Sequence, residues 1–248
     1  MQPFRLDGLR AIVTGGASGI GEATSRALTD AGATVTIVDI DRDRTDALAR
    51  RLPGASSLIV DITDEAALAK ALASLDRLDI LVNNAGIGLV GSIEETAAAD
   101  FRRLYQVNVE GLFLVTKACL PALLAAQGTV INVGSVAGLV GIKRRFAYCA
   151  TKGAVIALTR EMAIDYAGRL RVNCVAPGTV NTPFVEAYLE KNHKHEKDAV
   201  REQLRARHPM NRLAEPDEVA QMIVYLASPA AAFVTGSVMT IDGGLTAG

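Results

Sequence analysis

One short stretch of the chain carries three side chains that could together transfer a proton. Ser135 precedes Tyr148 by thirteen residues and Lys152 follows it by four, a spacing that places the tyrosine and the lysine on one face of a helix. A phenol with a pKa of about 10 is almost fully protonated at neutral pH unless a nearby cation favours its anion. Lowering that pKa to about 7 requires roughly 4 kcal/mol, which close positive charges can supply in a partly dry site. Tyr148 is therefore a candidate general acid or base. Because Tyr-x-x-x-Lys also occurs on solvated helix faces, this interpretation depends on the rest of the chain.

A glycine-rich turn near the amino terminus predicts a site for a phosphate-containing ligand. An apolar run over residues 9–14 precedes the pattern Gly15-x-x-x-Gly19-x-Gly21, and residues 22–31 continue as a predicted helix. Glycines in such a turn let the backbone approach a pyrophosphate, whose charge is met by amide N–H groups and by the positive end of the helix. The order of strand, turn and helix predicts a dinucleotide-binding unit.

An acidic residue ends the second predicted strand, residues 33–39, at the place where a ribose-binding carboxylate belongs. Asp39 would accept hydrogen bonds from both ribose hydroxyls and would repel a 2′-phosphate. Its charge therefore favours NAD over NADP. Arg42 and Arg44 follow closely and could pair with such a phosphate, although both also fit a solvated helix start.

The remaining pattern predicts one α/β domain. Strand-like apolar runs alternate with helical ones, and no linker, repeat or low-complexity segment interrupts them. We expect residues 1–248 to form a single doubly wound Rossmann domain, with a seven-stranded parallel sheet and helices on both faces. A charged segment at about 183–212 is expected to form a solvated helical lid, on which His193 and His195 would face apart and form no metal pair. The other predicted strands cover residues 57–60, 79–86 with the following turn, 128–133, 170–175 and 237–241.

Polar residues lie where predicted strands end, the edge at which open α/β sheets bind ligands. Asp61 and Ile62 follow the third strand and could hold an adenine ring by a polar edge and an apolar face. Asn84 follows the fourth strand, where a structural role and ligand contact are equally open. Asn108 lies inside the predicted helix 99–125, and because Asn competes for backbone hydrogen bonds it suggests a local break or a functional carbonyl.

These ordered motifs resemble those of the short-chain dehydrogenase/reductase family over essentially the whole chain. The resemblance implies a Rossmann fold, a nicotinamide cofactor, and a homotetramer or homodimer built on the long helices. The motifs that carry it are Thr14-Gly15-x-x-x-Gly19-x-Gly21, Asn83-Asn84-Ala85-Gly86, Asn108, Ser135, Tyr148-x-x-x-Lys152 and Pro177-Gly178.

The resemblance also implies roles for single residues. Tyr148 exchanges a proton with the substrate oxygen, and Ser135 hydrogen-bonds that oxygen. Lys152 binds the nicotinamide ribose and, with the positive nicotinamide ring, lowers the pKa of the phenol, while Asn108 holds a water behind it. Gly134 stands where the family often has serine, a difference expected to alter loop packing more than chemistry. The residues expected to bind cofactor are Gly15, Ser18, Gly19, Ile20, Gly21, Asp39, Ile40, Asp61, Ile62, Asn84, Gly86, Tyr148, Lys152, Pro177, Gly178, Val180 and Thr182.

Three consecutive cations, residues 143–145, precede Tyr148 and suggest an anionic substrate. Arginine suits a carboxylate because its fork can bond both oxygens. Arg145 and Arg207 are similar to the arginines that hold the carboxylate in the family branch with type 2 3-hydroxybutyrate and 2-keto-3-deoxy-fuconate dehydrogenases. Tyr188 lies near the place where that branch can carry a third arginine. The three cations fit a solvated loop or a subunit contact equally well.

We therefore expect an NAD-dependent oxidoreductase that interconverts a secondary alcohol and a ketone by hydride transfer, with Tyr148 as general acid and base. A small hydroxy acid or sugar acid is the expected substrate. The alternatives are a relative acting on a neutral cyclic, sugar or steroid alcohol, a 3-oxoacyl reductase, and a non-catalytic NAD-binding regulator.

Composition narrows the expected partners and location. The 26 basic and 27 acidic residues give a formal charge of −1, so no general electrostatic footprint for nucleic acid is present. Met1 to Asp7 lack the apolar core of a signal peptide, and no stretch approaches 18 uninterrupted apolar residues. We expect a cytoplasmic protein without a membrane or metal partner. Its reduced and mostly buried thiols would be those of Cys119, Cys149 and Cys174, which lack C-x-x-C spacing.

Overall fold

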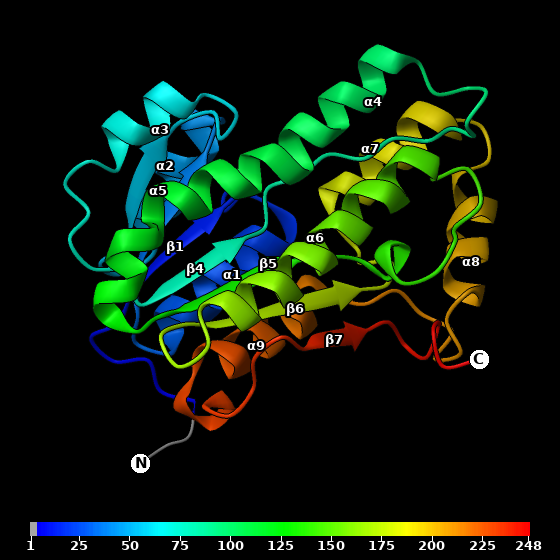
Figure 1. Cartoon of the computed structure of the whole chain (residues 1–248). Coiled ribbons are helices and arrows are strands. Elements are labelled where there is room, and N and C mark those ends of the chain that lie inside the picture. Colours follow the sequence, from blue (N-terminus) through cyan, green and yellow to red (C-terminus); the bar gives the residue numbers. More distant parts are fainter. Residues whose placement is uncertain (1–3) are drawn as a thin grey trace.

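The computed structural model describes residues 4–248, and these form a seven-stranded parallel sheet (Figure 1). Met1 to Pro3, with which the predicted domain begins, lie outside the described residues. The strand order is β3-β2-β1-β4-β5-β6-β7, so the chain reverses direction across the sheet between β1 and β4. Such a switch point opens a crevice at the carboxyl ends of the strands. The strands are β1 (Arg10–Thr14), β2 (Thr34–Asp39), β3 (Ser56–Ile59), β4 (Ile80–Asn83), β5 (Thr129–Val133), β6 (Arg171–Pro177) and β7 (Val238–Ile241).

Helices cover both faces of this sheet, which confirms the predicted doubly wound Rossmann architecture. One face packs against α1, α2 and α9, and the other against α3, α5 and α6. The helices are α1 (Gly19–Asp30), α2 (Arg42–Arg51), α3 (Glu65–Ala71), α4 (Ala98–Tyr105), α5 (Gly111–Ala126), α6 (Phe146–Asp165), α7 (Pro183–Asn192), α8 (Lys197–Ala206) and α9 (Pro216–Ala227).

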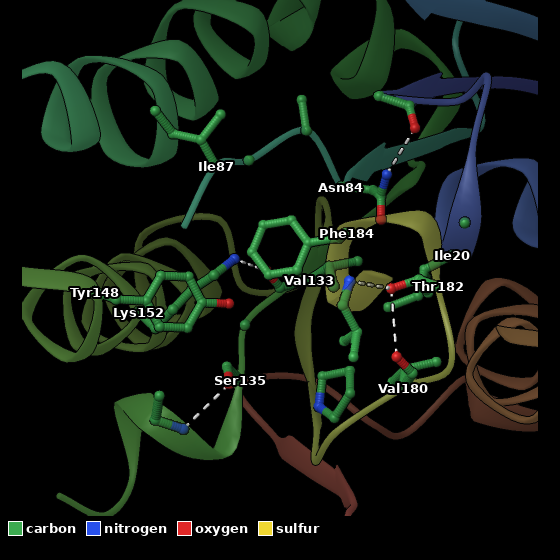
Figure 2. A pocket seen from close by; sticks show the side chains of 18 of the residues that line it. Ile20, Asn84, Ile87, Val133, Ser135, Tyr148, Lys152, Val180, Thr182 and Phe184 are labelled. Carbon is green, nitrogen blue, oxygen red and sulfur yellow. Dashed lines mark hydrogen bonds between the residues drawn. The ribbon is translucent and has the colours of Figure 1, made fainter. Parts of the chain in front are cut away.

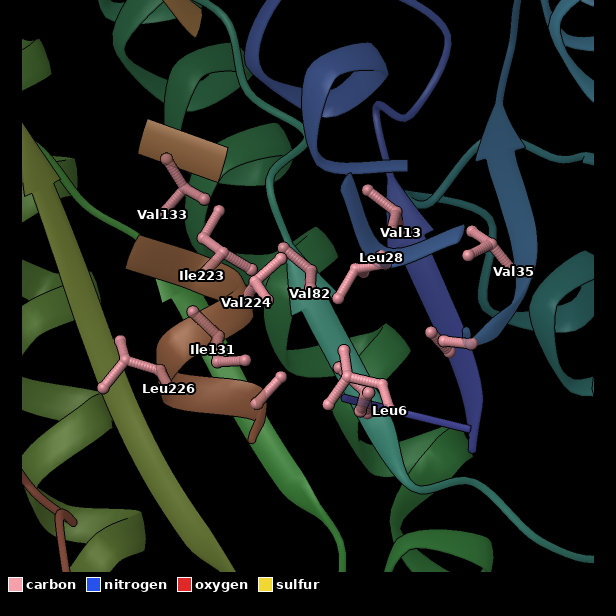
Figure 3. Close-up of a cluster of buried hydrophobic side chains, with 14 of the residues drawn as sticks. Leu6, Val13, Leu28, Val35, Val82, Ile131, Val133, Ile223, Val224 and Leu226 are labelled. Carbon is pink, nitrogen blue, oxygen red and sulfur yellow. The ribbon is translucent and has the colours of Figure 1, made fainter. Parts of the chain in front are cut away.

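Alternation along the strands divides the core between the two faces. Val13 packs with Leu28 of α1 and Ile223 of α9, as Figure 3 shows, whereas its neighbour Ile12 packs with Leu114 of α5. Successive side chains of a strand point to opposite faces, so a strand buried on both sides needs the near-continuous apolar run seen in the sequence. Full burial of each such side chain contributes about 1.5–3 kcal/mol, and the strand ends are therefore held on a rigid frame.

The long predicted helix around Asn108 is interrupted. A π-helical turn, Gln106–Glu110, separates α4 from α5, and Asn108 lies in its centre. The local break predicted from that residue is confirmed. By length and composition, residues 98–126 are the one helix of the described chain that could cross a membrane, with 44% of the most apolar window buried. Leu114 and Leu123 of this helix lie in the core, as in a helix that packs on a sheet.

Helices α7 and α8 form the predicted lid, residues 183–212, but the lid is not simply solvated. Its apolar side chains make a small core of their own, which consists of Val185, Leu189, Val200, Leu204 and Leu213. The expectation that His193 and His195 lie on one helix is wrong, because both fall in the link between α7 and α8. Among the described residues no group of three or more His, Cys, Asp or Glu side chains is placed to hold a metal ion.

Candidate active site

A cavity of about 720 Å³ opens at the carboxyl ends of the strands, below the lid (Figure 2). Its wall includes the glycine turn after β1, the ends of β2 to β6 and the first turns of α6 and α7. Nearly all residues that the sequence singles out for cofactor, substrate and proton transfer line this one space. Gly21 and Asn108 are the exceptions: Gly21 lies under the glycine turn, and Asn108 lies behind Gly86.

The glycine turn is built to let backbone approach a ligand. Gly15 and Gly19 have φ values of 59° and 54°, a region that side chains disfavour. A Cβ at Gly21 would collide with the carbonyl of Gly15, so this position also requires glycine. Ser18 precedes α1 but makes no side-chain capping bond, and the first N–H groups of the helix stay available for an anion.

Asn84 braces this turn from β4. Its Nδ2 donates to the carbonyl of Thr14 at 3.0 Å and to that of Gly15 at 2.9 Å, and the residue also lines the cavity. The two roles left open by the sequence are thus compatible. Asn83 serves the frame alone, since its Nδ2 donates to Thr116 and to Asn132 beneath the sheet edge.

Asp39 occupies the end of β2 with its carboxylate held by backbone. Oδ1 accepts from the N–H groups of Ile40 at 2.8 Å and Asp41 at 3.2 Å, and Oδ2 accepts from Ala17 in the glycine turn at 3.2 Å. A carboxylate has about four acceptor sites, so one remains for a ligand. The predicted competitor Arg44 is paired with Asp41, at 3.3 Å between Nε and Oδ2.

Residues after β3 line the next part of the cavity. Asp61 accepts from the N–H of Thr63 at 2.9 Å, and this bond lowers the pKa of the Asp61 carboxyl. Ile62 is buried beside it, whereas Ile40 is 69% exposed at the cavity rim. Arg103 of α4 also lines this part, and it was not predicted because α4 is brought to the cavity only by the fold.

Tyr148 and Lys152 lie together on the first turns of α6, as their spacing predicts. The Lys152 ammonium is 5.8 Å from the centroid of the Tyr148 ring and donates to the carbonyl of Val133 at 2.8 Å. Burial lowers the pKa of Lys152 to about 8. This ammonium is thus anchored to the end of β5, behind the phenol.

The protein's own groups raise the pKa of Tyr148, whereas the predicted lowering relied on Lys152 together with a positive nicotinamide ring. Desolvation by the surrounding protein raises it, and the hydroxyl of Ser135 and the charge of Arg145 oppose that rise without overcoming it. The protein's own groups therefore favour the neutral phenol. Among the cations of the described residues, Arg145, three residues before the tyrosine, is the one that opposes this rise.

Ser135 follows β5 and begins a short 3₁₀ turn. Its Oγ accepts from the N–H of Ala137 at 3.1 Å, which orients the hydroxyl, and Figure 2 shows Ser135 and Tyr148 at the same end of the cavity. Gly134 before it has no room for a side chain, because a Cβ there would lie 2.6 Å from Sγ of Cys174. The difference at Gly134 thus concerns packing, and burial raises the pKa of the Cys174 thiol to about 11.

Asn108 ties the π-helical turn to the cavity wall. Its Oδ1 accepts from the N–H of Ile87 at 2.8 Å, and its Nδ2 donates to the Ile87 carbonyl at 2.9 Å and to the Thr151 hydroxyl at 3.1 Å. Thr151 precedes Lys152, so the bonds of Asn108 fix the helix that carries the lysine. Three of the four hydrogen-bonding positions of its side chain take part in this bracing.

The two arginines before Tyr148 have different surroundings. Arg144 points away and pairs with Glu95, at 3.0 Å between Nη1 and Oε1. Arg145 lines the cavity, donates to the carbonyl of Leu89 at 3.3 Å and lies over the ring of Tyr188, with Cζ 4.6 Å from the centroid. Among the described residues Arg145 has no carboxylate partner, and desolvation lowers its pKa. Arg207 lines the same cavity from the end of α8.

Two lid residues that line the site were not predicted to do so from the sequence. Tyr188 stacks on Arg145, and Phe184 places its ring between the Tyr148 side of the cavity and the Thr182 side (Figure 2). Gly88 makes room for the Phe184 ring, because a Cβ at Gly88 would collide with it. No periodicity or spacing marks these aromatic residues, since their place depends on how α7 folds over the sheet.

Comparison with known proteins yields a family match and close relatives. A family model described as enoyl-(acyl carrier protein) reductase matches residues 15–246. The 2-(S)-hydroxypropyl-CoM dehydrogenase 3 of Xanthobacter autotrophicus is 42% identical over 95% of both chains. The 2-keto-3-deoxy-L-fuconate dehydrogenase of Xanthomonas campestris pv. campestris is 38% identical over 97% of this chain and 81% of its own length. The crystal structure of levodione reductase superimposes with a TM-score of 0.94 at 30% identity, covering 98% of this chain and 99% of the other.

Proposed function

The chain belongs to the short-chain dehydrogenase/reductase family, and we propose that it is an NAD-dependent enzyme that oxidises or forms a small hydroxy acid or sugar acid. Its reaction interconverts a secondary alcohol and a ketone. The observation that carries the substrate proposal is the guanidinium of Arg145, which is desolvated in the cavity wall and has no acidic partner among residues 4–248.

The residues of the cavity fit a dinucleotide. The glycine turn leaves backbone N–H groups free at the start of α1, and Gly15, Gly19 and Gly21 exclude side chains where a pyrophosphate would lie. Asp39 and Lys152 would hold its two riboses, and Asp61 with Ile62 its adenine. A bound nicotinamide dinucleotide supplies the hydride acceptor or donor.

The preference for NAD is supported at Asp39. A 2′-phosphate on the ribose would bring its negative charge against the Asp39 carboxylate. Arg44 is engaged with Asp41, and neither Arg42 nor Arg44 lines the cavity within the described chain. Neither of these two arginines is therefore placed in the cavity wall to balance such a phosphate.

Proton transfer is proposed at the hydroxyl of Tyr148. Ser135 lies beside it to hydrogen-bond the substrate oxygen, and Lys152 and Arg145 contribute positive charge around the phenol. In ketone reduction the neutral phenol favoured by burial donates its proton to the forming alkoxide. In alcohol oxidation it accepts that proton, and the nearby cations stabilise the phenolate. Asn108 keeps the helix that carries Lys152 in register.

The anionic end of the substrate is assigned to Arg145, with Arg207 lining the same cavity. A desolvated guanidinium without an acidic partner is costly unless a ligand supplies the counter-charge. Its planar fork presents two parallel N–H groups to the two oxygens of a carboxylate. The name of the relative that acts on a keto-deoxy sugar acid agrees with this substrate class.

A second candidate is a 3-oxoacyl reductase, since a relative from Thermotoga maritima that is 38% identical to this chain is named as a 3-oxoacyl-(acyl-carrier-protein) reductase. A neutral cyclic, sugar or steroid alcohol is the third, and levodione reductase, whose fold this chain shares, is named for a dione. Both alternatives predict that activity does not depend on Arg145. A non-catalytic NAD-binding regulator would bind NADH without turnover.

The test is a panel of hydroxy acids, matched neutral alcohols and 3-oxoacyl thioesters, assayed with NAD(H) and with NADP(H). Turnover of acids with NAD supports the proposal. Turnover of neutral alcohols or thioesters alone would exclude the acid substrate, and faster turnover with NADP would exclude the role given to Asp39. As a check on proton transfer, Tyr148→Phe should lose at least 100-fold in kcat, consistent with general acid–base catalysis.

We also propose that the chain acts as a homotetramer or homodimer in the cytoplasm, folded as one domain over residues 1–248. Exposed apolar side chains on α5 and α6 support the assembly, with Phe113, Phe146 and Ile164 open to solvent in the single chain. Light scattering after size-exclusion chromatography distinguishes these assemblies from a monomer.

A further inference from the structure

A buried histidine joins the lid to the cavity wall, outside the residues proposed for proton transfer. His208 is 3% exposed and follows the end of α8. Its Nδ1 lies 2.9 Å from the carbonyl of Leu204, one turn earlier in the lid, and its Nε2 accepts from the N–H of Thr179 at 3.0 Å. Thr179 belongs to the turn after β6 and precedes His208 by 29 residues.

The partners of His208 fix its tautomer. A backbone N–H can only donate, so Nε2 beside Thr179 must be the unprotonated acceptor. A backbone carbonyl can only accept, so Nδ1 must carry the hydrogen that goes to Leu204. The imidazole is therefore neutral, and a ring protonated on both nitrogens would bring two donors together at Thr179.

Glycine makes room for the ring at this junction. A Cβ at Gly178 would lie 2.7 Å from Nε2 of His208, and a Cβ at Gly243 would lie 3.3 Å from the His208 Cβ. The ring thus sits between the end of the lid, the turn after β6 and the segment after β7. A side chain at Gly178 would displace it.

Both sides of the junction line the cavity. Leu204 and Arg207 come from the lid, and Pro177, Gly178 and Thr179 come from the turn. The bond between His208 and Thr179 ties the end of α8 to that turn, where the Thr179 carbonyl also accepts from the N–H of Ala214 at 3.0 Å. Arg207 immediately precedes His208, so the same bond restrains its backbone.

We propose that His208 is a positioning residue, whose neutral Nδ1–H tautomer clamps the lid to the Pro177–Thr179 turn and thereby closes the cofactor end of the cavity. That this cavity binds a nicotinamide cofactor rests on the proposed function. The tautomer of His208 and its bond to Thr179 do not rest on that function, because both can be measured without substrate.

Two substitutions separate the clamp from simple packing. The carboxamide of His208→Gln reaches the Nε2 position and can still accept from Thr179, whereas that of His208→Asn reaches only the Nδ1 position and can still donate to Leu204. We expect His208→Asn to raise the dissociation constant of NADH at least tenfold and to speed hydrogen exchange of the Thr179 amide. His208→Gln should stay within about threefold of the unchanged protein in both measurements. His195→Gln, at an exposed site between α7 and α8, is the matched control and should change neither.

The tautomer is read directly from a ¹⁵N-histidine spectrum of the unchanged protein. The chain has three histidines, so the signal lost in His208→Gln identifies His208. A protonated Nδ1 with an unprotonated Nε2 supports the clamp, and the opposite tautomer overturns it.

Equal NADH affinity and equal hydrogen exchange of the Thr179 amide in His208→Gln and His208→Asn would also overturn the clamp. If His208→Asn does not fold, the spectrum and the Gln variant decide. If the unchanged protein binds no NADH, the proposed function fails, while tautomer and amide exchange still test the clamp.

Discussion

The guanidinium of Arg145 lies over the ring of Tyr188, with Cζ 4.6 Å from the ring centroid. Arg145 precedes α6 in the cavity wall and Tyr188 belongs to α7 in the lid, so the stack connects these two parts. The hydroxyl of Tyr188 lies 3.0 Å from Nε2 of His193, which holds the ring from its far end. Stacking uses the face of the guanidinium and leaves its edge to bond a planar anion.

Adjacent arginines provide a matched pair for testing the substrate. Arg145→Ala should raise KM for a hydroxy acid by about 10- to 100-fold, because a charge-assisted bond to a carboxylate contributes roughly 1.5–3 kcal/mol. KM for a matched neutral alcohol should change by less than about threefold. Arg144→Ala is the control, since Arg144 pairs with Glu95 on the outside of the loop. Steady-state kinetics with both substrates decides, and equal losses in the two arginine variants would contradict the assignment.

The stack itself can be tested at Tyr188. Tyr188→Phe keeps the ring over Arg145 and removes only the contact with His193, whereas Tyr188→Leu removes the aromatic face. Aromatic contact with a cation contributes about 0.5–2 kcal/mol, so the Leu variant should raise KM for the acid by about 3- to 30-fold. The Phe variant should stay near the unchanged protein. A larger effect in Phe than in Leu would show that the hydroxyl, and not the stack, positions Arg145.

Cofactor choice should depend on Asp39 and not on its acidic neighbour. Asp39→Asn removes the charge that repels a 2′-phosphate, and we expect the ratio of kcat/KM for NAD to that for NADP to fall at least tenfold. Asp41 caps α2 and pairs with Arg44 outside the cavity, so Asp41→Asn is the control for charge and local structure. Its ratio should change by less than about threefold. If the ratio of kcat/KM for NAD to that for NADP is unchanged in Asp39→Asn, the charge of Asp39 does not cause the preference for NAD.

Burial of Lys152 has a consequence for stability against pH. Its pKa falls from 10.5 in the unfolded chain to about 8 in the folded protein, so between these values the unfolded state binds more protons. Stability therefore rises with pH in this window, and the burial of the charged form costs about 3 kcal/mol below pH 8. Urea unfolding between about pH 7.5 and 8.5, below the range in which the thiols of the unfolded chain lose their protons, should show this rise, and Lys152→Met should remove it. Lys117→Met, at an exposed ion pair with Glu65, should retain it. The same slope in both variants would refute the assignment.

The frame and the cofactor side of the site could be predicted because their signals are local. Strand runs, the glycine pattern and the acid at the end of β2 are set by neighbours in sequence, and the fold places Gly15, Gly19 and Asp39 on one cavity. The break at Asn108 was also predictable, because the competition of its side chain with the helix is a local property. Parallel strands then bring their carboxyl ends together without further information.

The lid side could not be predicted, because it depends on contacts between remote segments. The stacking of Tyr188, the place of Phe184 and the two bonds of His208 all require α7 and α8 to lie over the sheet. The upward shift of the Tyr148 pKa in the protein alone was not predicted, for a related reason. A sequence gives the nearby charges but not the desolvation, and desolvation is the larger effect here.

The residues that positions 134 and 174 can carry depend on each other, although forty positions separate Gly134 and Cys174 in the sequence. The sulfur of Cys174 fills the space that a side chain at Gly134 would need, so the two positions must be exchanged together. Gly134→Ser alone would push the loop that carries Ser135, whereas combining it with Cys174→Ala frees volume for the new hydroxyl. Anyone grafting this active-site loop onto another member of the family must therefore carry a piece of β6 with it.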